Sequence, residues 1–195
     1  DEDEDPVEGE TDEDDDDGDD EGGDDGDGED GDDDSDDDGD GEDGEDAIFG
    51  GADDDSIAGH NDDDVLHGDG GDDTLQGSAG NDQLFGDAGD DALRGGLDDD
   101  TLTGGEGQDT LFGGWGNDTL NGLVDDPDAA GITDNDDADY LNGGGGDDLI
   151  VAGQGDIVTA GDGADQIVLG DWIASGPAAE IIDFEAQGDS LLFVW

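Results

Sequence analysis

The sequence predicts an all-β fold built from short, regularly repeated units, and three observations lead to this prediction. In residues 95–121, three nonapeptides follow one another without a gap on the pattern G-G-x-G-x-D-x-U-x, where U is a large aliphatic residue, with Asp98 at the fourth place of the first. Asp occupies the sixth place and an aliphatic residue the eighth place throughout. The same frame continues on both sides of this segment. A fixed short period of this kind indicates an architecture in which each unit stacks on its neighbours.

The repeat frame extends from residue 41 to residue 168, and we number its places one to nine from the first glycine. Nine uninterrupted repeats occupy residues 41–121, another opens at Gly122, and the last three open at Gly143, Ala152 and Ala160. Thirteen repeats keep both marker residues. Their place-six aspartates are Asp46, Asp55, Asp64, Asp73, Asp82, Asp91, Asp100, Asp109, Asp118, Asp139, Asp148, Asp156 and Asp165. Their place-eight residues are Ile48, Ile57, Leu66, Leu75, Leu84, Leu93, Leu102, Leu111, Leu120, Leu141, Ile150, Val158 and Ile167.

These nonapeptides resemble the RTX family of glycine-rich calcium-binding repeats, over about two thirds of the chain. The resemblance implies a calcium-loaded parallel β-roll, a β-solenoid in which G-G-x-G-x-D forms the turn and x-U-x a short strand. The U side chain would point inward, because successive side chains in a strand point to opposite faces. Two repeats would make one coil, so that each repeat lies above the one two places further on. Asp53, Asp62 and Asp98 replace glycine at place four, where they tolerate unusual backbone dihedrals better than other residues.

The resemblance also implies where calcium binds. The place-six aspartates of two repeats in adjacent coils would approach one gap, and backbone carbonyls from places one to four would complete about six oxygen ligands. Thirteen repeats give up to eleven such pairs. The predicted metal ligands are the thirteen aspartates together with backbone carbonyls of the first glycines, which are Gly50, Gly59, Gly68, Gly77, Gly86, Gly95, Gly104, Gly113 and Gly143.

The charge balance independently requires a cation from solution. The 195 residues contain 68 Asp and Glu and one basic residue, Arg94, which gives a formal charge of −67. Only 28% of the residues are apolar, a balance typical of a disordered polyanion. Carboxylates and carbonyls are hard ligands, so a divalent cation such as calcium is the natural neutraliser.

Composition and sequence also exclude several classes of protein. Without Cys there are neither disulfides nor thiolate metal sites. Nucleic acid is excluded as a partner, because contacts to phosphate need Lys and Arg. No stretch is long enough for a membrane span. The chain begins at Asp1 without a signal-peptide pattern, which indicates a processed form, a fragment or export by another route.

Three segments lie outside the regular array. Residues 1–40 contain 28 acidic residues, and we expect a disordered tail. Residues 34–45 fit the EF-hand loop pattern, but the Gly/Asp-rich flanks cannot supply its two helices, so no EF-hand is expected. Residues 123–134 interrupt the repeat of Gly122 as a tolerated loop or, alternatively, a partner-binding loop. The repeat of Ala152 is one residue short, so its metal site and that of Ala160 are expected to depart from the regular geometry.

Residues 169–195 are richer in apolar side chains, including Trp172, Ile173, Phe184 and Leu191. The run E-I-I-D-F at 180–184 with G-D-S-L at 188–191 is similar to a segment that often closes RTX arrays. We expect this segment to form a β cap that covers the last coil and protects its open edge. A C-terminal export signal is the alternative role, since RTX proteins typically leave the cell through a one-step channel.

No catalytic residue is predicted, because the sequence has no nucleophile–base pairing, zinc spacing or phosphate loop. His60 falls in a turn and His67 on an outward strand position, where we expect solvated surface residues rather than ligands of a transition metal. Phe49, Phe85 and Phe112 occupy outward positions, with Trp115 in a turn. They are either singly exposed side chains or a contact surface.

The sequence therefore predicts a non-enzymatic, secreted calcium-binding roll that folds on metal binding outside the cell. Two alternatives stay open. The chain is the C-terminal folding and secretion module of a larger exported enzyme or toxin, or it is a subunit that associates end to end in an extracellular filament or matrix.

Overall fold

The computed structural model describes residues 41, 44–123, 138–170, 177–185 and 188–194. Within them the chain forms two parallel sheets and no helix, so the predicted all-β solenoid is confirmed. The acidic tail, most of the interruption after Gly122, and Trp172 and Ile173 lie outside the described residues.

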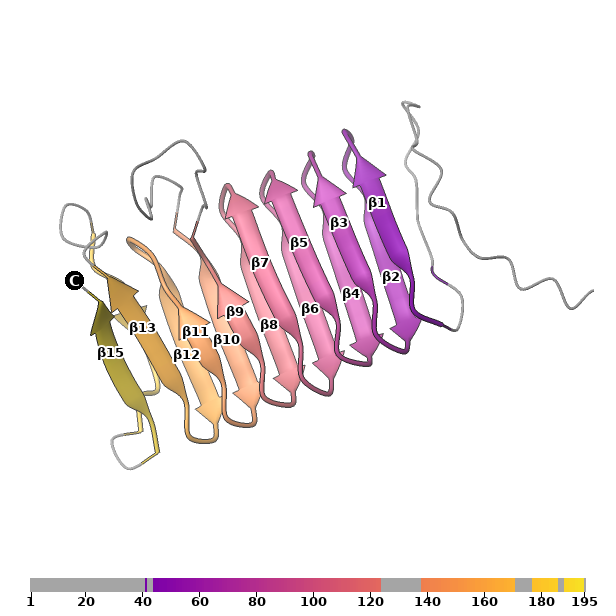
Figure 1. The fold of residues 1–195 in the computed structure, drawn as a ribbon. Coiled ribbons are helices and arrows are strands. Elements are labelled where there is room, and N and C mark those ends of the chain that lie inside the picture. Colours follow the sequence, from indigo (N-terminus) through magenta and orange to yellow (C-terminus); the bar gives the residue numbers. More distant parts are fainter. Residues whose placement is uncertain (1–40, 42–43, 124–137, 171–176, 186–187, 195) are drawn as a thin grey trace, which may run out of the picture.

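Successive repeats alternate between the two sheets (Figure 1). The eight-stranded sheet contains β1 (Ala47–Gly51), β3 (Val65–Asp69), β5 (Gln83–Ala88), β7 (Thr101–Glu106), β9 (Thr119–Asn121), β11 (Leu149–Val151), β13 (Gln166–Gly170) and β15 (Ser190–Val194), in that order. The seven-stranded sheet contains β2 (Ser56–Asn61), β4 (Thr74–Ala79), β6 (Ala92–Leu97), β8 (Thr110–Trp115), β10 (Tyr140–Gly145), β12 (Ile157–Asp162) and β14 (Glu180–Ile181). Each repeat therefore lies above the one two places further on, as predicted.

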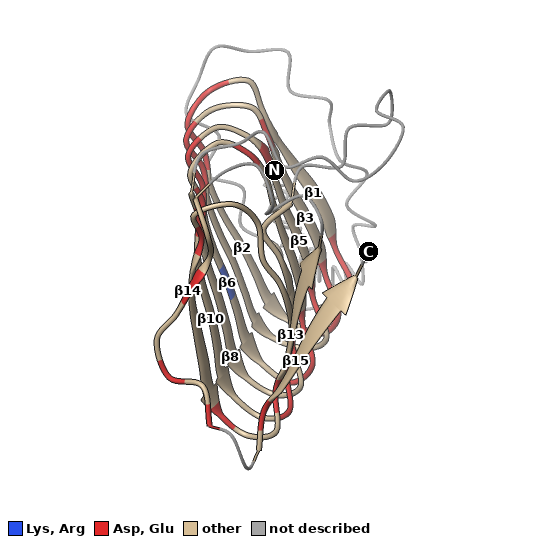
Figure 2. Cartoon of the chain, turned by 90° about the vertical axis from the view of Figure 1, so that its left-hand side faces the viewer, with Lys and Arg blue, Asp and Glu red and all other residues tan. Residues whose placement is uncertain are grey.

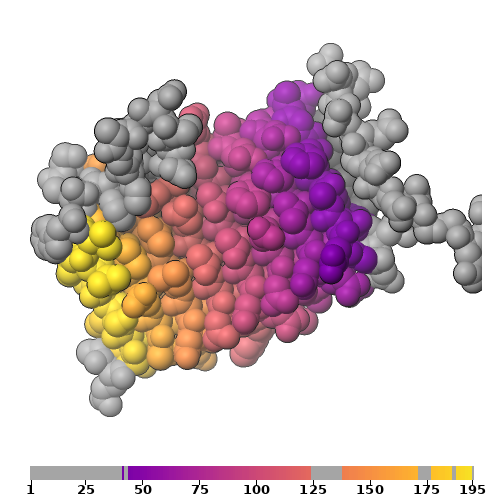
Figure 3. Space-filling model, viewed as in Figure 1, coloured from indigo at the N-terminus to yellow at the C-terminus, as the bar shows by residue number. Residues whose placement is uncertain are grey.

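The place-eight residues form the core between the sheets. The parallel register pairs equivalent residues of adjacent coils, for example Leu93 with Leu111 and Leu84 with Leu102. From Ile57 to Ile167 every place-eight side chain is buried, whereas Ile48 in the first coil is half-buried. In the space-filling view the coils lie directly against one another along the stack (Figure 3). The core thus consists of two aliphatic ladders, one from each sheet, which pack into a single cluster.

The turns need left-handed backbone at places two and four. Place four has positive φ in Asp62 (71°) and Asp98 (75°), as expected, but not in Asp53. Place two also has positive φ where it holds a side chain, as in His60 and Ser78. Most other turns place glycine at these positions, because it adopts this conformation without steric cost. Figure 2 shows the acidic residues gathered at the turns, with the basic residue on β6.

The interruption leaves the register of the roll intact. Tyr140 in β10 pairs with Thr110 in β8, so the twelve extra residues lie between β9 and β10 without displacing a coil. The shorter repeat of Ala152 is absorbed in the same way, since Tyr140 pairs with Ile157.

The described part of the C-terminal segment adds one strand to each sheet at the end of the roll. β14 pairs with β12, and β15 pairs with β13 as the last strand of its sheet. The apolar side chains of β15 are exposed, at 38–49% from Leu191 to Val194. Among the described residues, the predicted C-terminal β segment is therefore present and pairs its backbone with the last strands of the array, and β15 forms the outer edge of its sheet. Its role as a cap stays a prediction.

Candidate metal centre

The place-six aspartates line the interior at the turns. Twelve of the thirteen are buried, and the exception, Asp46 in the first coil, is half-buried. They point inward because side chains two residues apart lie on the same face of a strand, which puts place six, place eight and place one of the following repeat on one face. A carboxylate is rarely buried without a partner, so the contacts of these side chains decide what the rows can do.

In eleven of the thirteen aspartates, one carboxylate oxygen is held by the coil before. The backbone N–H of Asp91 donates to Oδ1 of Asp109 at 2.9 Å, and that of Asp109 donates to Oδ1 of Asp139 at 2.8 Å. The same bond joins every pair of place-six aspartates in adjacent coils, across both the interruption and the short repeat. The aspartates of all eleven predicted pairs therefore lie next to each other, and the hydrogen bond fixes the orientation of the accepting carboxylate in each pair.

The second carboxylate oxygen remains available in most of the row. Within the described part of the chain, ten of these buried oxygens accept no hydrogen bond, namely Oδ2 of Asp46, Asp64, Asp73, Asp82, Asp91, Asp100, Asp109, Asp118, Asp148 and Asp165. Leaving a buried charged acceptor unsatisfied is costly, by roughly 1–3 kcal/mol or more. A row of such atoms indicates that the fold is built around a cation.

The space in front of these oxygens exists because place one is glycine. A Cβ added to Gly41 would lie 2.6 Å from Asp46 Oδ2 and 3.0 Å from the carbonyl oxygen of Gly59 in the next coil. A side chain is excluded there, although the φ of Gly41 is not in the left-handed region. Each such space, which we call a cradle, thus joins a carboxylate oxygen and a carbonyl oxygen.

The cradle recurs along the array, and it includes several of the predicted carbonyls. Those of Gly68, Gly86, Gly104, Gly113 and Gly143 each face the place-one glycine of the coil before. The carbonyl of Ala160 does the same opposite Gly143, which the prediction omitted. At Gly122 the Oδ2 atoms of Asp139 and Asp156 both face one cradle. Because these donors are all oxygens, the set suits a hard divalent ion such as calcium.

Electrostatics favour a cation in the same place. Burial raises the pKa of Asp91, Asp100 and Asp148 to about 7 and that of Asp82, Asp109 and Asp118 to about 6. Burial also raises the pKa of Asp64, Asp73 and Asp165. Like-charged neighbours contribute, as Asp109 does for Asp91. Without a cation, the folded state would resist ionisation of these groups.

Two features at the C-terminal end depart from the regular pattern. In the short repeat, Oδ2 of Asp156 accepts the backbone N–H of Gly153 at 2.6 Å, so this predicted ligand oxygen has a protein partner. Beyond the predicted row, Asp189 Oδ1 accepts the N–H of Asp165 at 3.3 Å. The sequence offered a pattern that could have identified Asp189, because Asp189-Ser-Leu191 has the same spacing of aspartate and aliphatic residue as places six to eight of a repeat. In the structure Leu191 pairs with Ile167, a place-eight residue.

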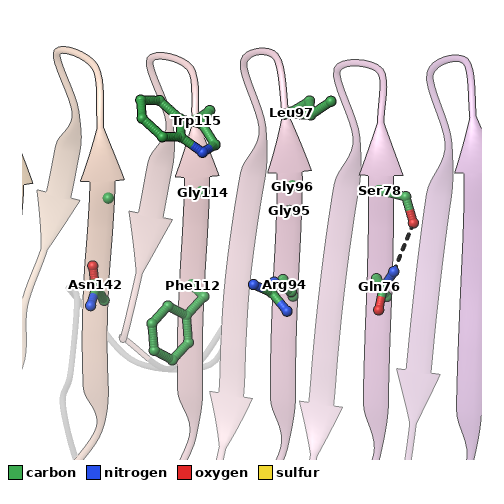
Figure 4. A pocket seen from close by; sticks show the side chains of 11 residues that line it. Gln76, Ser78, Arg94, Gly95, Gly96, Leu97, Phe112, Gly114, Trp115 and Asn142 are labelled. Carbon is green, nitrogen blue, oxygen red and sulfur yellow. Dashed lines mark hydrogen bonds between the residues drawn. The ribbon is translucent and has the colours of Figure 1, made fainter.

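A shallow groove on the outer face of the seven-stranded sheet holds the basic residue Arg94 (Figure 4). Trp115 and Leu97 are exposed beside it, and Gln76 donates to Ser78 Oγ at 2.9 Å.

Trp115 and Phe112 therefore face outward, as predicted. His60 is exposed and has φ 78°, but it lies within β2, so the prediction that it falls in a turn is wrong. His67 is on the outer face of β3, but its side chain is only 25% exposed, so the expectation of a solvated residue is wrong.

Comparison with known families identifies the repeat. The chain is similar to the RTX calcium-binding nonapeptide repeat over residues 40–75, 67–102, 94–126, 132–156 and 154–171. No curated protein matches the chain. Of the residues that the structure describes, none belongs to a helix long and apolar enough to cross a membrane.

Proposed function

Because the chain belongs to the family of RTX calcium-binding nonapeptide repeats, we propose that its roll folds by loading a row of calcium ions into the cradles. The observation that carries this proposal is the row of buried Oδ2 atoms without hydrogen-bond partners, all of which except that of Asp165 lie opposite a place-one glycine. The proposed ligands are the thirteen place-six aspartates, with carbonyls of the place-one residues. When bound, calcium supplies the positive charge that these oxygens lack.

Calcium binding and folding are coupled in this proposal. The aliphatic core consists of one ladder of side chains from each sheet, and the carboxylates beside it repel one another. A metal that binds only the folded state adds its binding free energy to stability. The unfolded chain offers no assembled cradle, because each one joins residues of two coils.

Circular dichroism with and without Ca²⁺, followed by calorimetric stoichiometry, tests the proposal. We expect a disordered spectrum in chelator and a β spectrum in millimolar Ca²⁺, the affinity range of extracellular calcium modules, about 10⁻⁴–10⁻³ M. A β spectrum that persists in excess chelator at neutral pH would contradict it.

Adjacent aspartates provide a matched pair of variants. Asp100 is buried in the row, with its Oδ2 unpaired, while Asp99 is exposed and accepts the N–H of Asn117 at 2.7 Å. Each Asp→Asn change removes one charge and keeps the shape. Asp100→Asn should raise the calcium midpoint of folding severalfold, because a ligand charge is lost. Asp99→Asn should leave it nearly unchanged. Equal midpoints would show that overall charge, not the cradle, sets calcium dependence.

The proposed setting is extracellular. Cytosolic calcium is too low to fill millimolar sites, so the chain would stay unfolded before export and fold outside. The module of a larger exported enzyme or toxin is the alternative within the same chemistry. The coding sequence upstream of Asp1 separates the two, because only the module of a larger protein is preceded by an enzyme or toxin domain.

An assembly subunit is a second candidate, and the exposed edge strand β15 favours it. Leu191, Leu192, Phe193 and Val194 are all exposed on the last strand of a parallel sheet whose other edge is β1. Unpaired strand edges recruit further strands. Sedimentation over a calcium series tests this: end-to-end association should appear only where the roll is folded, and a strictly monomeric folded chain would exclude it.

A further inference from the structure

Three potential metal ligands meet on the outer face of the eight-stranded sheet, away from the cradles. A ring nitrogen of His67 and carboxylate oxygens of Asp69 and Asp87 lie within 4.8 Å of one another. His67 and Asp69 come from β3 and Asp87 from β5. Nδ1 of His67 is 2.9 Å from Asp87 Oδ2 and donates to it, because an ionised carboxylate only accepts.

The imidazole of His67 is clamped between two aromatic rings. Its centroid is 4.9 Å from that of Phe49 and 4.5 Å from that of Phe85, with interplanar angles of 7° and 10°. Strand register produces the stack, since Phe49 pairs with His67 and His67 with Phe85. Two parallel neighbours fix the plane of the ring and hold Nδ1 toward the carboxylates. A ligand held in this way loses little conformational entropy on binding.

The two carboxylates occur where the array otherwise favours glycine. Asp69 and Asp87 occupy place two with φ of 67° and 69°, and the same place in the coils before and after holds Gly51 and Gly105. Two like charges therefore stand on adjacent strands of a chain with a formal charge of −67. Arg94 lies on the other sheet, in β6 (Figure 2). The two neighbouring carboxylates therefore favour the binding of a cation.

We propose that His67, Asp69 and Asp87 form a separate site for a divalent transition metal such as Zn²⁺. One imidazole nitrogen and two carboxylate oxygens suit such a metal, whereas calcium takes oxygen ligands and gains nothing from the ring. The metal replaces the proton at Nδ1, and the neutral ring then carries its proton on Nε2. Three protein ligands leave further coordination positions to water. This chemistry separates the site from the all-oxygen cradles.

The chain offers a matched control, because it has only two histidines. The full chain is first saturated with Ca²⁺, which fills the oxygen sites and folds the roll, and is then titrated with Co²⁺ and with Zn²⁺. We expect one additional metal per chain, visible as Co²⁺ absorption bands that Zn²⁺ abolishes. His67→Ala should remove this step, with at least about a tenfold loss of affinity, and His60→Ala should leave it unchanged.

The carboxylates are tested independently of the ring. Asp87→Asn and Asp69→Asn should each weaken Zn²⁺ binding, while the β spectrum and calcium midpoint stay those of the parent chain. If His67→Ala fails to fold, the two Asn variants decide the matter. Unaltered Zn²⁺ binding in the Asn variants, equal losses in His67→Ala and His60→Ala, or no Co²⁺ absorption in the parent chain would each overturn the proposal.

Discussion

Acid should replace calcium in folding this roll. In excess chelator, lowering the pH from about 7.5 to about 5 should convert the chain from a disordered to a β-rich state, because protonation removes the buried charge that calcium otherwise neutralises. The sign follows from the direction of the shifts. Burial raises the pKa of the row carboxylates above their unfolded value, so the folded state binds protons more tightly. Stability of the metal-free roll is then greatest below about pH 4 and falls as the pH rises toward 7.

The magnitude of the effect decides whether it can be seen. The pKa of Asp91, which burial raises from 3.8 to about 7, is matched by those of Asp100 and Asp148. Because each pKa unit corresponds to about 1.4 kcal/mol, one such group costs the metal-free fold at most about 4 kcal/mol at neutral pH. Solvent screening reduces this figure. Even a third of it, repeated along the row, matches the whole stability of a small domain, about 5–15 kcal/mol.

Far-UV circular dichroism over a pH series in chelator provides the assay. High salt at neutral pH is the control, since about 1 M salt screens exposed charges within roughly 3 Å but leaves buried carboxylates ionised. Acid should induce the β spectrum and salt should not. If salt folds the chain as well as acid does, repulsion among the exposed acidic residues opposes folding, and the argument from buried carboxylates is wrong.

Two further perturbations test the cradle and the ends of the roll. Gly95→Ala would place a Cβ 2.7 Å from the carbonyl oxygen of Gly113; it should destabilise the folded roll by about 1–3 kcal/mol and raise the calcium concentration at the folding midpoint. Gly145→Ala is the control, because its Cβ would meet only the Trp115 ring, at 3.4 Å, and it should destabilise the roll less. Equal midpoints of the two variants in a calcium titration would refute the steric argument. Deleting residues 1–40, which carry 28 acidic residues, should promote end-to-end association at calcium levels where the full chain is monomeric, because like-charge repulsion is lost; light scattering that finds the shortened roll monomeric at every calcium level would contradict this.

The architecture could be predicted from the sequence because its determinants are local and periodic. Place eight of each repeat forms the buried column, and place six lies on the same face, so the phase alone identifies both rows. The bond from each aspartate N–H to Oδ1 in the next coil could not be predicted, because it depends on how closely the coils stack. It makes most place-six aspartates, such as Asp91 and Asp100, structural acceptors through Oδ1 as well as metal ligand candidates through Oδ2.

The environment of His67, by contrast, could not be predicted from its own position in the repeat. Taken singly, a histidine at an outward strand position is a surface residue. Its contacts come from Phe49 and Phe85, each eighteen residues away, and from Asp87 in the following coil. Such contacts become visible only when residues are compared at the spacing of a full coil. The same comparison identifies Asp189 as the continuation of the row beyond Asp165.

Variation among the repeats separates two reasons for glycine and leads to a count of calcium ions. Place two requires left-handed φ, yet it accepts His60 and Ser78, so conformation alone does not enforce glycine. Place one does not require that conformation, yet it is glycine in every repeat up to Gly143 and becomes alanine only at Ala152 and Ala160. These last two repeats are the ones without a further full repeat stacked two places on. Glycine therefore marks the eleven pairs that can form a cradle, and methyl groups close the row. Calorimetry at saturation should give no more than about eleven tightly bound Ca²⁺ per chain, and a stoichiometry of thirteen would show that place-one glycine does not define the sites.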